Sequence, residues 1–389
     1  MTSSRNAYSP ESVSPPGRSL RRALAAMDMS QAQLASRLGK TEKFVSEVVN
    51  GKAPISPETA LHLEHVLGTP ASFWNNRERA YREHLARANE ARQLAAQAAW
   101  ARRFPLRTMV ERGWLPKGSD RIAQTAQLLD FFGIATPREW SALWDDRLSA
   151  VAFRQSKTYE IDRCALSAWL RYGEIAARKL ECDDYNRESF REALATARAL
   201  TTKAPEIFED ALVDLCAKAG VAVVFTPDLP KTRVSASVRW LTPRKALIQL
   251  GLRYKTDDHL WSGFYHEAVH VLKHGKKTPY LETDGLSDDA ELEAGRIAAD
   301  ILIPRRRYED FVSTTPVCSE RIVGFADSLG IAPGIVVGRL QHDGVIPYTH
   351  CNGLKRRFKR TAAATWASLP AQSERGRVRA GTTAGRLPA

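Results

Sequence analysis

The sequence predicts a mainly α-helical protein with an α+β domain in its C-terminal part. Helical spacing of apolar residues dominates the chain up to about residue 219. Three short runs rich in Val, Ile and Trp follow, and they predict a small sheet at Val221–Phe225, Ser235–Trp240 and Ala246–Leu250. Helical spacing then returns at Trp261–His274 and at Ala290–Ile303, where Pro304 ends the pattern.

Length and composition indicate several domains in a cytoplasmic protein. The chain has 389 residues, which is more than one compact domain usually holds. No run of about eighteen apolar residues occurs, so we expect no membrane span. The Ser- and Pro-rich residues 1–17 contain no apolar stretch, which favours a disordered leader over a secretory signal. Five scattered cysteines without CxxC spacing favour free thiols over disulfides.

Much of the net charge of +13 is concentrated at the C-terminus. Residues 353–389 contain nine basic side chains and one acidic one, which together give +8. We interpret residues 356–389 as a basic disordered tail. Such a tail adds attraction to phosphates that does not depend on base sequence, or it simply keeps the protein in solution. A protein with general nucleic-acid affinity and no specific operator is therefore one hypothesis.

Residues 18–76 are predicted to form a small helical domain. Ser19–Met27 has the spacing of one apolar helix face. Ser30 precedes a helix that Gly39 ends, and Thr41 precedes a helix that Gly51 ends. Ser56-Pro57 then begins a fourth helix. Two short helices joined by a tight turn with glycine form a helix-turn-helix unit, whose second helix enters the major groove of DNA.

Polar residues of this unit are the candidates for contact with DNA. Those expected on the outer side of the second helix are Thr41, Glu42, Lys43, Ser46 and Glu47. Those placed to touch phosphates are Gln31, Gln33 and Lys52. Any surface helix also presents polar residues, so the prediction depends on the whole pattern and not on any single side chain.

Four short segments in and after this unit resemble Cro/cI-type (XRE) domains, and within them the HigA-type antitoxins. The matching segments are Asn50-Gly51-Lys52, Ile55–Leu63, Leu67-Gly68 and Phe73-Trp74. The resemblance implies a lambda-repressor-like helical bundle that binds a double-stranded DNA operator, usually as a homodimer, with a toxin as a further partner. It also implies association with the nucleoid when DNA is bound. Glu42 and Glu47 would accept hydrogen bonds from cytosine N4, or they would weaken DNA binding.

Residues 77–203 are predicted to be a helical linker or middle module. Arg77–Arg103 has the pattern of a polar helix, and shorter helical patterns follow at Ile122–Phe132 and Trp140–Trp144. Further helices are expected at about Arg187–Thr202 and Glu206–Ala219. The C-terminal domain is assigned to residues 204–355.

The sequence His266-Glu267-Ala268-Val269-His270 has the HExxH pattern of zinc enzymes. On a helix this spacing puts both imidazoles on one face, where they reach one Zn²⁺, while Glu267 activates the bound water. Catalytic zinc usually has three protein ligands, and Glu291 is the candidate for the third, with Glu293 as the alternative. We interpret His274 as a helix-end residue, because one straight helix does not wrap three side chains around one metal ion.

Residues 204–355 resemble the ImmA/IrrE family of metallo-endopeptidases. The family pattern has a HExxH helix and then a second helix with a glutamate ligand, which Glu291 matches, as do the surrounding positions Ala294, Ala298, Leu302 and Pro304. The resemblance implies a zincin-like fold and Zn²⁺ held by His266, His270 and Glu291. Two positions depart from the family.

The first departure is Gly295, where the family has Asn or Asp to hold a histidine ligand in place, and Asp288 or Asp289 would have to substitute. The second is Val269, where small residues are common.

Two functions are consistent with these observations. The first is a transcriptional regulator of the toxin–antitoxin or phage-repressor type with a zinc-dependent endopeptidase domain. Glu267 would take a proton from water, and the substrate would be a regulatory protein. The alternative is a non-catalytic HigA-like repressor or antitoxin, whose C-terminal domain is a sensor or a partner-binding module.

Overall fold

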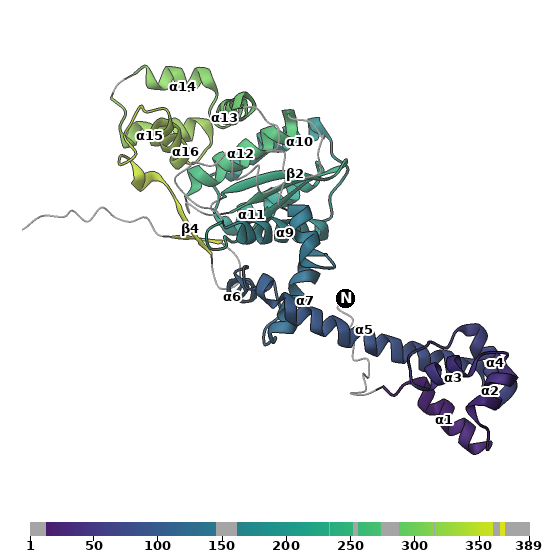
Figure 1. The fold of residues 1–389 in the computed structure, drawn as a ribbon. Coiled ribbons are helices and arrows are strands. Elements are labelled where there is room, and N and C mark those ends of the chain that lie inside the picture. The colour runs from purple at the N-terminus through teal and green to yellow at the C-terminus, as the bar shows by residue number, and fades with distance from the viewer. Residues whose placement is uncertain are drawn as a thin grey trace, which may run out of the picture. The chain divides into compact units, whose positions relative to one another are not determined.

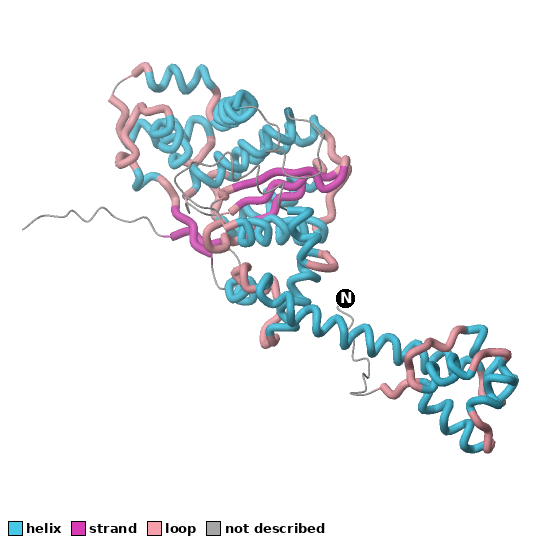
Figure 2. The backbone as a smooth tube through the Cα atoms, viewed as in Figure 1, coloured by secondary structure: helices cyan, strands magenta, loops and turns pink. Residues whose placement is uncertain are grey.

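A computed structural model describes residues 13–144, 162–232, 234–251, 256–273, 288–314, 316–360 and 366–369. The chain divides into two compact units (Figures 1 and 2). One contains Met1–Ala99 and Ser119–Ala126, and the other contains Trp100–Gly118 and Gln127–Ala389. The first helices of the chain are α1 (Pro16–Ala26), α2 (Gln31–Leu38), α3 (Glu42–Val49), α4 (Pro57–Leu67) and α5 (Ala71–Ala101).

Helix caps in the first unit follow the sequence prediction. The Ser30 hydroxyl accepts a hydrogen bond from the Gln33 backbone N–H at 3.1 Å, and the Gln33 side chain accepts one from the Ser30 N–H at 2.9 Å. Thr41 accepts from the backbone N–H of Phe44 at 3.2 Å, at the start of α3. Each cap satisfies a backbone donor that the first helical turn leaves free. The predicted starts of α2 and α3 are therefore confirmed.

The first helix begins earlier than the sequence predicted. Helix α1 starts at Pro16, inside the segment assigned to the disordered leader, and Pro16 and Gly17 are buried. A Cβ added at Gly17 would lie 2.1 Å from the carbonyl oxygen of Val49, so the bare backbone of α1 packs against the end of α3. This close approach explains why Gly17 belongs to the fold. Residues 1–12 of the predicted leader lie outside the described residues.

The remaining helices and strands include those that build the second unit. The helices are α6 (Leu106–Glu111), α7 (Arg121–Phe132), residues 137–144, α9 (Arg163–Lys179), α10 (Arg187–Leu200), α11 (Pro205–Ala217), α12 (Asp257–Lys273), α13 (Asp288–Leu302), α14 (Arg305–Val312), α15 (Ser319–Leu329), α16 (Pro333–His342) and the 3₁₀ helix η1 (Asn352–Leu354). The strands are β1 (Val221–Phe225), β2 (Ala236–Thr242), β3 (Lys245–Leu250), β4 (Arg357–Arg360) and β5 (Trp366–Leu369).

Strands β1, β3 and β2 form a mixed sheet in that order, which confirms the predicted small sheet. β1 pairs with the central β3 in parallel, and β2 pairs with it antiparallel. Side chains alternate between the two faces of a strand. Val221 and Val223 of β1 therefore pack into the large core with α12, while Ala222 and Val224 pack against α9. Helices on both faces make β1 and β3 almost wholly buried. β1 is therefore a continuous apolar run, and β3 is apolar except for Lys245 and the buried Gln249.

Helices α9 and α10 pack with the sheet domain, although the sequence analysis placed residues 77–203 in a middle module. Ala177 of α9 lies against the sheet, and Phe190 and Leu194 of α10 belong to the large core. Helix α9 is buried at every position from Cys164 to Leu170, so this part of the helix has no single apolar stripe to show which partner it covers.

The predicted disordered tail is wrong at its beginning. Residues after 355 continue into β4, which pairs with β5, and Phe358 is fully buried in the core. The Arg356 guanidinium donates to the carbonyls of Thr202 and Lys203 at 3.1 and 3.0 Å, and it pairs with buried Asp257 at 3.3 Å. A basic run can therefore be part of a fold when its charges have partners. The predicted tail beyond Leu369 lies outside the described residues.

The five cysteines are free thiols, as the sequence predicted. Among the described helices none is long and apolar enough by itself to cross a membrane. Within the described part of the chain, one pair of helices, α15 and α16, reaches that length and composition when taken together, and the pair is bent by 114° at the junction.

Candidate metal centre and DNA-binding surface

Helix α12 presents both histidines of the HExxH pattern on one face. His266 and His270 are four residues apart, so they lie one turn from each other. Their ring centroids are 4.7 Å apart and their Nε2 atoms are 3.0 Å apart. The opposite side of α12 holds the helix in the core through buried residues that include Trp261, Phe264 and Ala268. Packing on that side fixes the direction in which the two imidazoles point.

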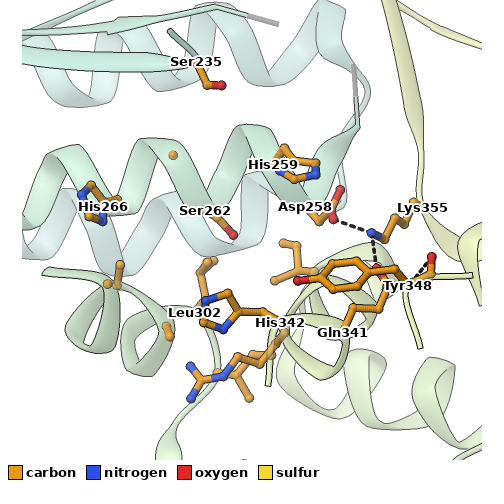
Figure 3. Close-up of a pocket in the computed structure, with 18 residues that line it drawn as sticks. Ser235, Asp258, His259, Ser262, His266, Leu302, Gln341, His342, Tyr348 and Lys355 are labelled. Atoms are coloured by element: carbon orange, nitrogen blue, oxygen red, sulfur yellow. Dashed lines mark hydrogen bonds and ion pairs between the residues drawn. The ribbon is translucent and has the colours of Figure 1, made fainter. Parts of the chain in front are cut away.

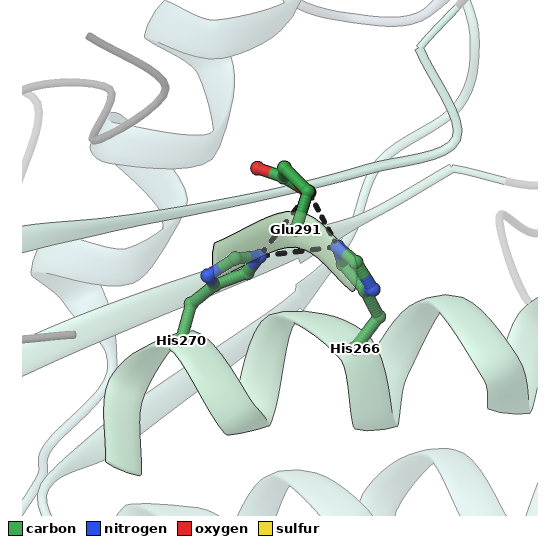
Figure 4. A group of neighbouring side chains, drawn as sticks. All are labelled: His266, His270 and Glu291. Atoms are coloured by element: carbon green, nitrogen blue, oxygen red, sulfur yellow. Dashed lines mark hydrogen bonds and ion pairs between the residues drawn. The ribbon is translucent and has the colours of Figure 1, made fainter. Parts of the chain in front are cut away.

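Glu291 reaches this pair from the first turn of α13 (Figure 4). Its Oε2 atom lies 3.0 Å from Nε2 of His266 and 3.6 Å from Nε2 of His270. His270 is 3% exposed, whereas His266 and Glu291 are 30% and 35% exposed. The group therefore has a buried side and an open side. Glu293, the alternative ligand from the sequence, is not a member of this group.

The distances within the group fit a tetrahedral zinc ion. Ligand atoms about 2.05 Å from a tetrahedral centre are about 3.3 Å from one another. The three separations among His266, His270 and Glu291 are 3.0, 3.0 and 3.6 Å, which lie on both sides of that value. Two imidazole nitrogens and one carboxylate are also a donor set that zinc prefers, and three protein ligands leave a fourth position open.

The environment of the group shifts the pKa of its members. Hydrogen bonds from His266 and His270 hold the pKa of the Glu291 carboxyl far below its usual range. Burial acts to lower the pKa of His266, but the hydrogen bond with Glu291 and the charge of Glu267 outweigh it, so this pKa is raised. Burial raises the pKa of Glu267. A raised pKa brings Glu267 nearer to the value of a general base that works at neutral pH.

The positions that depart from the family pattern have different surroundings. Val269 is fully buried in the core. Gly295 is exposed on α13, and a Cβ added there would meet no atom within 4 Å. Asp289 is exposed, while the side chain of Asp288 lies outside the described residues, as does His274. The space beside Gly295 is therefore open, one helical turn after Glu291.

A pocket of about 420 Å³ begins at His266 and runs along α12 (Figure 3). Its walls come from α12, α13 and α16, together with Ser235, Tyr348 and Lys355. This pocket was not predicted from the sequence. The small residues on α12 and α13 recur at helical spacing, and this is a signal that could have indicated the pocket. The sequence does not show, however, that these two helices face each other.

The candidate DNA-contacting residues all retain some exposure on the surface of the first unit. Gln31, Gln33, Thr41, Glu42, Lys43 and Lys52 are exposed, and Ser46 and Glu47 are partly exposed. The Thr41 hydroxyl and the side-chain oxygen Oε1 of Gln33 already accept hydrogen bonds that cap helices, so both side chains have a structural role as well. Asn50, which was not among the predicted DNA contacts, is exposed at the end of α3 and donates to the Ser46 carbonyl at 2.9 Å.

Comparison with known proteins identifies the first unit. Residues 20–74 match the helix-turn-helix family. Three solved structures are among those similar to this chain, each with a TM-score of 0.20. A HigA-family addiction module antidote protein from Coxiella burnetii is 31% identical and covers 22% of this chain and 94% of its own. The Pseudomonas aeruginosa antitoxin HigA with the higBA promoter is 31% identical and covers 21% of this chain and 90% of its own.

The third is a Pseudomonas aeruginosa protein in complex with its 18-base-pair operator DNA; it is 32% identical and covers 20% of this chain and 85% of its own. No curated protein matches the chain. The helix-turn-helix match ends at residue 74, before the His266, His270 and Glu291 group begins.

Proposed function

We propose that this chain is a DNA-binding transcriptional regulator whose second unit is a zinc-dependent endopeptidase. It carries an XRE-family helix-turn-helix domain at residues 20–74. The observation that supports the enzyme is the convergence of His266, His270 and Glu291, whose ligand atoms all lie within 4.8 Å of one another. Its substrate is a regulatory protein, which the first unit brings to the site of transcription. A toxin is an alternative partner, and the helix-turn-helix units act as a pair on a double-stranded operator.

The residues of the second unit divide the chemistry between them. His266, His270 and Glu291 would hold Zn²⁺, which when bound polarises a peptide carbonyl and lowers the pKa of a coordinated water to about 7. Glu267 follows His266 directly in α12, and it takes a proton from water and delivers it to the leaving amine. Burial raises the pKa of the Glu267 carboxyl, which makes it a better proton acceptor than an exposed glutamate. The buried His270 fixes the position of the centre within α12.

Replacing a ligand should remove the metal. We expect about one zinc ion per wild-type chain after purification at neutral pH, and almost none in His270→Ala, because two ligands hold zinc far less well than three. Elemental analysis measures this directly. His259→Ala is the control, since His259 lies on the same helix, is exposed and is outside the ligand group. A wild-type protein that binds no zinc even when zinc is supplied would contradict the proposed enzyme.

Replacing a phosphate-contacting side chain should weaken binding to all DNA. We expect Lys52→Ala to lower affinity similarly for a random duplex and for the DNA upstream of the chain's own gene. It should also reduce the slope of log K against log salt concentration by about 1. Fluorescence anisotropy at several salt concentrations measures both effects. Lys218→Ala, an exposed lysine in the second unit, should change neither. Equal effects of the two variants would argue against a phosphate contact at Lys52.

The second candidate function is a non-catalytic HigA-like repressor or antitoxin, and Gly295 favours it. A histidine ligand is usually held by a neighbouring polar group, and residue 295 has no side chain that could supply one. In this function the second unit is a sensor or a partner-binding module. Operator binding would then persist when Glu267 is replaced, and the wild type would cleave nothing.

A further inference from the structure

A second cavity, of about 350 Å³, lies between α10, the last turns of α12 and the middle of α13. We call it the α10 cavity. None of the three residues of the candidate metal centre lines it. It also shares no lining residue with the pocket that begins at His266. The α10 cavity is therefore a separate site within the second unit, and neither the proposed metal chemistry nor DNA binding uses it.

Part of the lining of the α10 cavity is apolar. Leu272 of α12 and Ile297 and Ile301 of α13 line it. All three pack against the large core, yet each remains only partly buried. A hydrocarbon group that covered these side chains would remove apolar surface from water, which is favourable in proportion to the area covered. The cavity therefore favours a guest with an apolar body.

The other prominent part of the lining is basic. Arg187, Arg191 and Arg198 of α10 and Lys273 of α12 all line the cavity, and none of the described residues that line it is acidic. Positive charges that lie close together repel one another, so an anion in the cavity would supply a counter-charge that the lining lacks. Charge complementarity therefore selects a negatively charged guest.

Two of the four cations are free to bind such an anion. Arg187 and Lys273 are exposed, and within the described part of the chain neither has an ion-pair partner. Arg191 does pair with Glu188, at 2.8 Å, but their side chains are 59% and 70% exposed. An exposed pair of this kind is held weakly, so Arg191 can turn to a ligand at little cost.

Arg198 provides a donor that the protein itself does not use. Its Nη2 atom donates to the carbonyl of Leu329 at 3.4 Å. Its Nε atom is buried and has no hydrogen-bond partner among the described residues. A buried donor without an acceptor is costly, and a ligand oxygen would remove that cost. Guanidinium groups match the planar geometry of a carboxylate, so a carboxylate is the anion that suits a cavity with three arginines.

We propose that the α10 cavity binds a small amphiphilic anion, namely a hydrocarbon chain that ends in a carboxylate. The chain covers Leu272, Ile297 and Ile301, and the carboxylate accepts hydrogen bonds from the arginines of α10. A volume of about 350 Å³ lies within the range of small-ligand sites. Because no residue of the metal centre takes part, the site is the same whether the second unit is an endopeptidase or a sensor.

Octanoate is the probe, and three comparisons test its two parts. Binding to the full chain is measured by isothermal titration calorimetry at concentrations where no micelles form. We expect octanoate to bind at least about 10-fold more tightly than octylammonium, which has the same chain and the opposite charge. Acetate, which lacks the chain, should show no measurable binding. Adding zinc or a chelator should leave the affinity for octanoate unchanged, since the metal centre is elsewhere.

Ala195→Phe tests the space in the cavity. Ala195 is an exposed residue of α10 that lines the cavity, so a phenyl ring there fills the cavity without entering the core. We expect octanoate to bind this variant about 10- to 100-fold more weakly. Ala199→Phe is the matched control, because Ala199 is an exposed alanine one turn later on α10 that does not line the cavity. It should bind octanoate as the wild type does.

Arg187→Glu tests the charge. Arg187 is the first residue of α10, and an acidic residue is favourable in the first turn of a helix, so the fold should tolerate the change. We expect a loss of octanoate affinity of about 10- to 100-fold. Arg306→Glu, at an exposed arginine in the first turn of α14 and outside the cavity, should have no effect. The urea midpoint of the second unit checks that all four variants are folded.

The outcomes separate this site from the metal centre. A wild type that does not bind octanoate overturns the inference and leaves the zinc proposal untouched. Binding that requires zinc would place octanoate at the metal centre, and binding that survives Ala195→Phe would place it outside the cavity; either result overturns the inference. Octylammonium that binds as tightly as octanoate would overturn the anionic class of the ligand.

Discussion

Glu267→Gln should lower the rate of peptide cleavage by about 10²- to 10⁴-fold, which is the usual contribution of a general base. Gln has nearly the same shape as Glu but cannot take a proton from water. The ligand atoms of His266, His270 and Glu291 are unchanged, so we expect zinc content to stay at the wild-type level. The assay uses a library of internally quenched peptides with the zinc-loaded full chain.

Glu293→Gln is the matched control for this variant, because Glu293 lies two residues after Glu291 in α13 but outside the ligand group. It should keep wild-type activity. A Glu267→Gln protein that cleaves as fast as wild type would show that another group takes the proton. A wild type that binds zinc and cleaves no peptide would favour the sensor or partner-binding function instead.

Local signals in the sequence were enough for the helix caps of the first unit and for the pairing of two histidines on one helix face. Ser30 and Thr41 are side chains whose hydroxyls cap the next helix, and a cap depends only on residues three positions away. The pairing of His266 with His270 likewise depends only on helix geometry. Signals of this kind involve only neighbouring residues of one helix, so they can be recognised in a single sequence.

The boundaries of the second unit depend on contacts between residues that are distant in sequence. Arg356 looks like the start of a charged tail until its partners are known, and these are Asp257 and the end of α10. Phe358 is a single apolar residue in a basic run, yet it is fully buried. The composition of a segment is an average over its residues, so it does not reveal the specific partner of a single side chain. The same limitation placed α9 in the wrong neighbourhood, because helix periodicity does not show which sheet a helix covers.

The buried ion pair between Glu174 of α9 and Arg239 of β2 should be a sensitive polar position in the second unit. Arg239 of β2 is 2% exposed, and its Nε lies 3.6 Å from Oε1 of Glu174, which also pairs with Arg171 at 2.8 Å. Glu174→Gln removes the negative charge that faces the buried Arg239. We expect the free energy of unfolding of this unit to fall by about 3 to 5 kcal/mol.

Glu188→Gln is a close control for this change. The Arg191–Glu188 pair has the same i,i+3 spacing and the same 2.8 Å distance as Arg171–Glu174, but its side chains are 59% and 70% exposed. Water already solvates both charges, so the loss should be at most about 1 kcal/mol. Urea unfolding of the full chain, followed at the transition of the second unit, compares the two midpoints. Equal shifts would mean that burial does not set the strength of the Arg239–Glu174 pair.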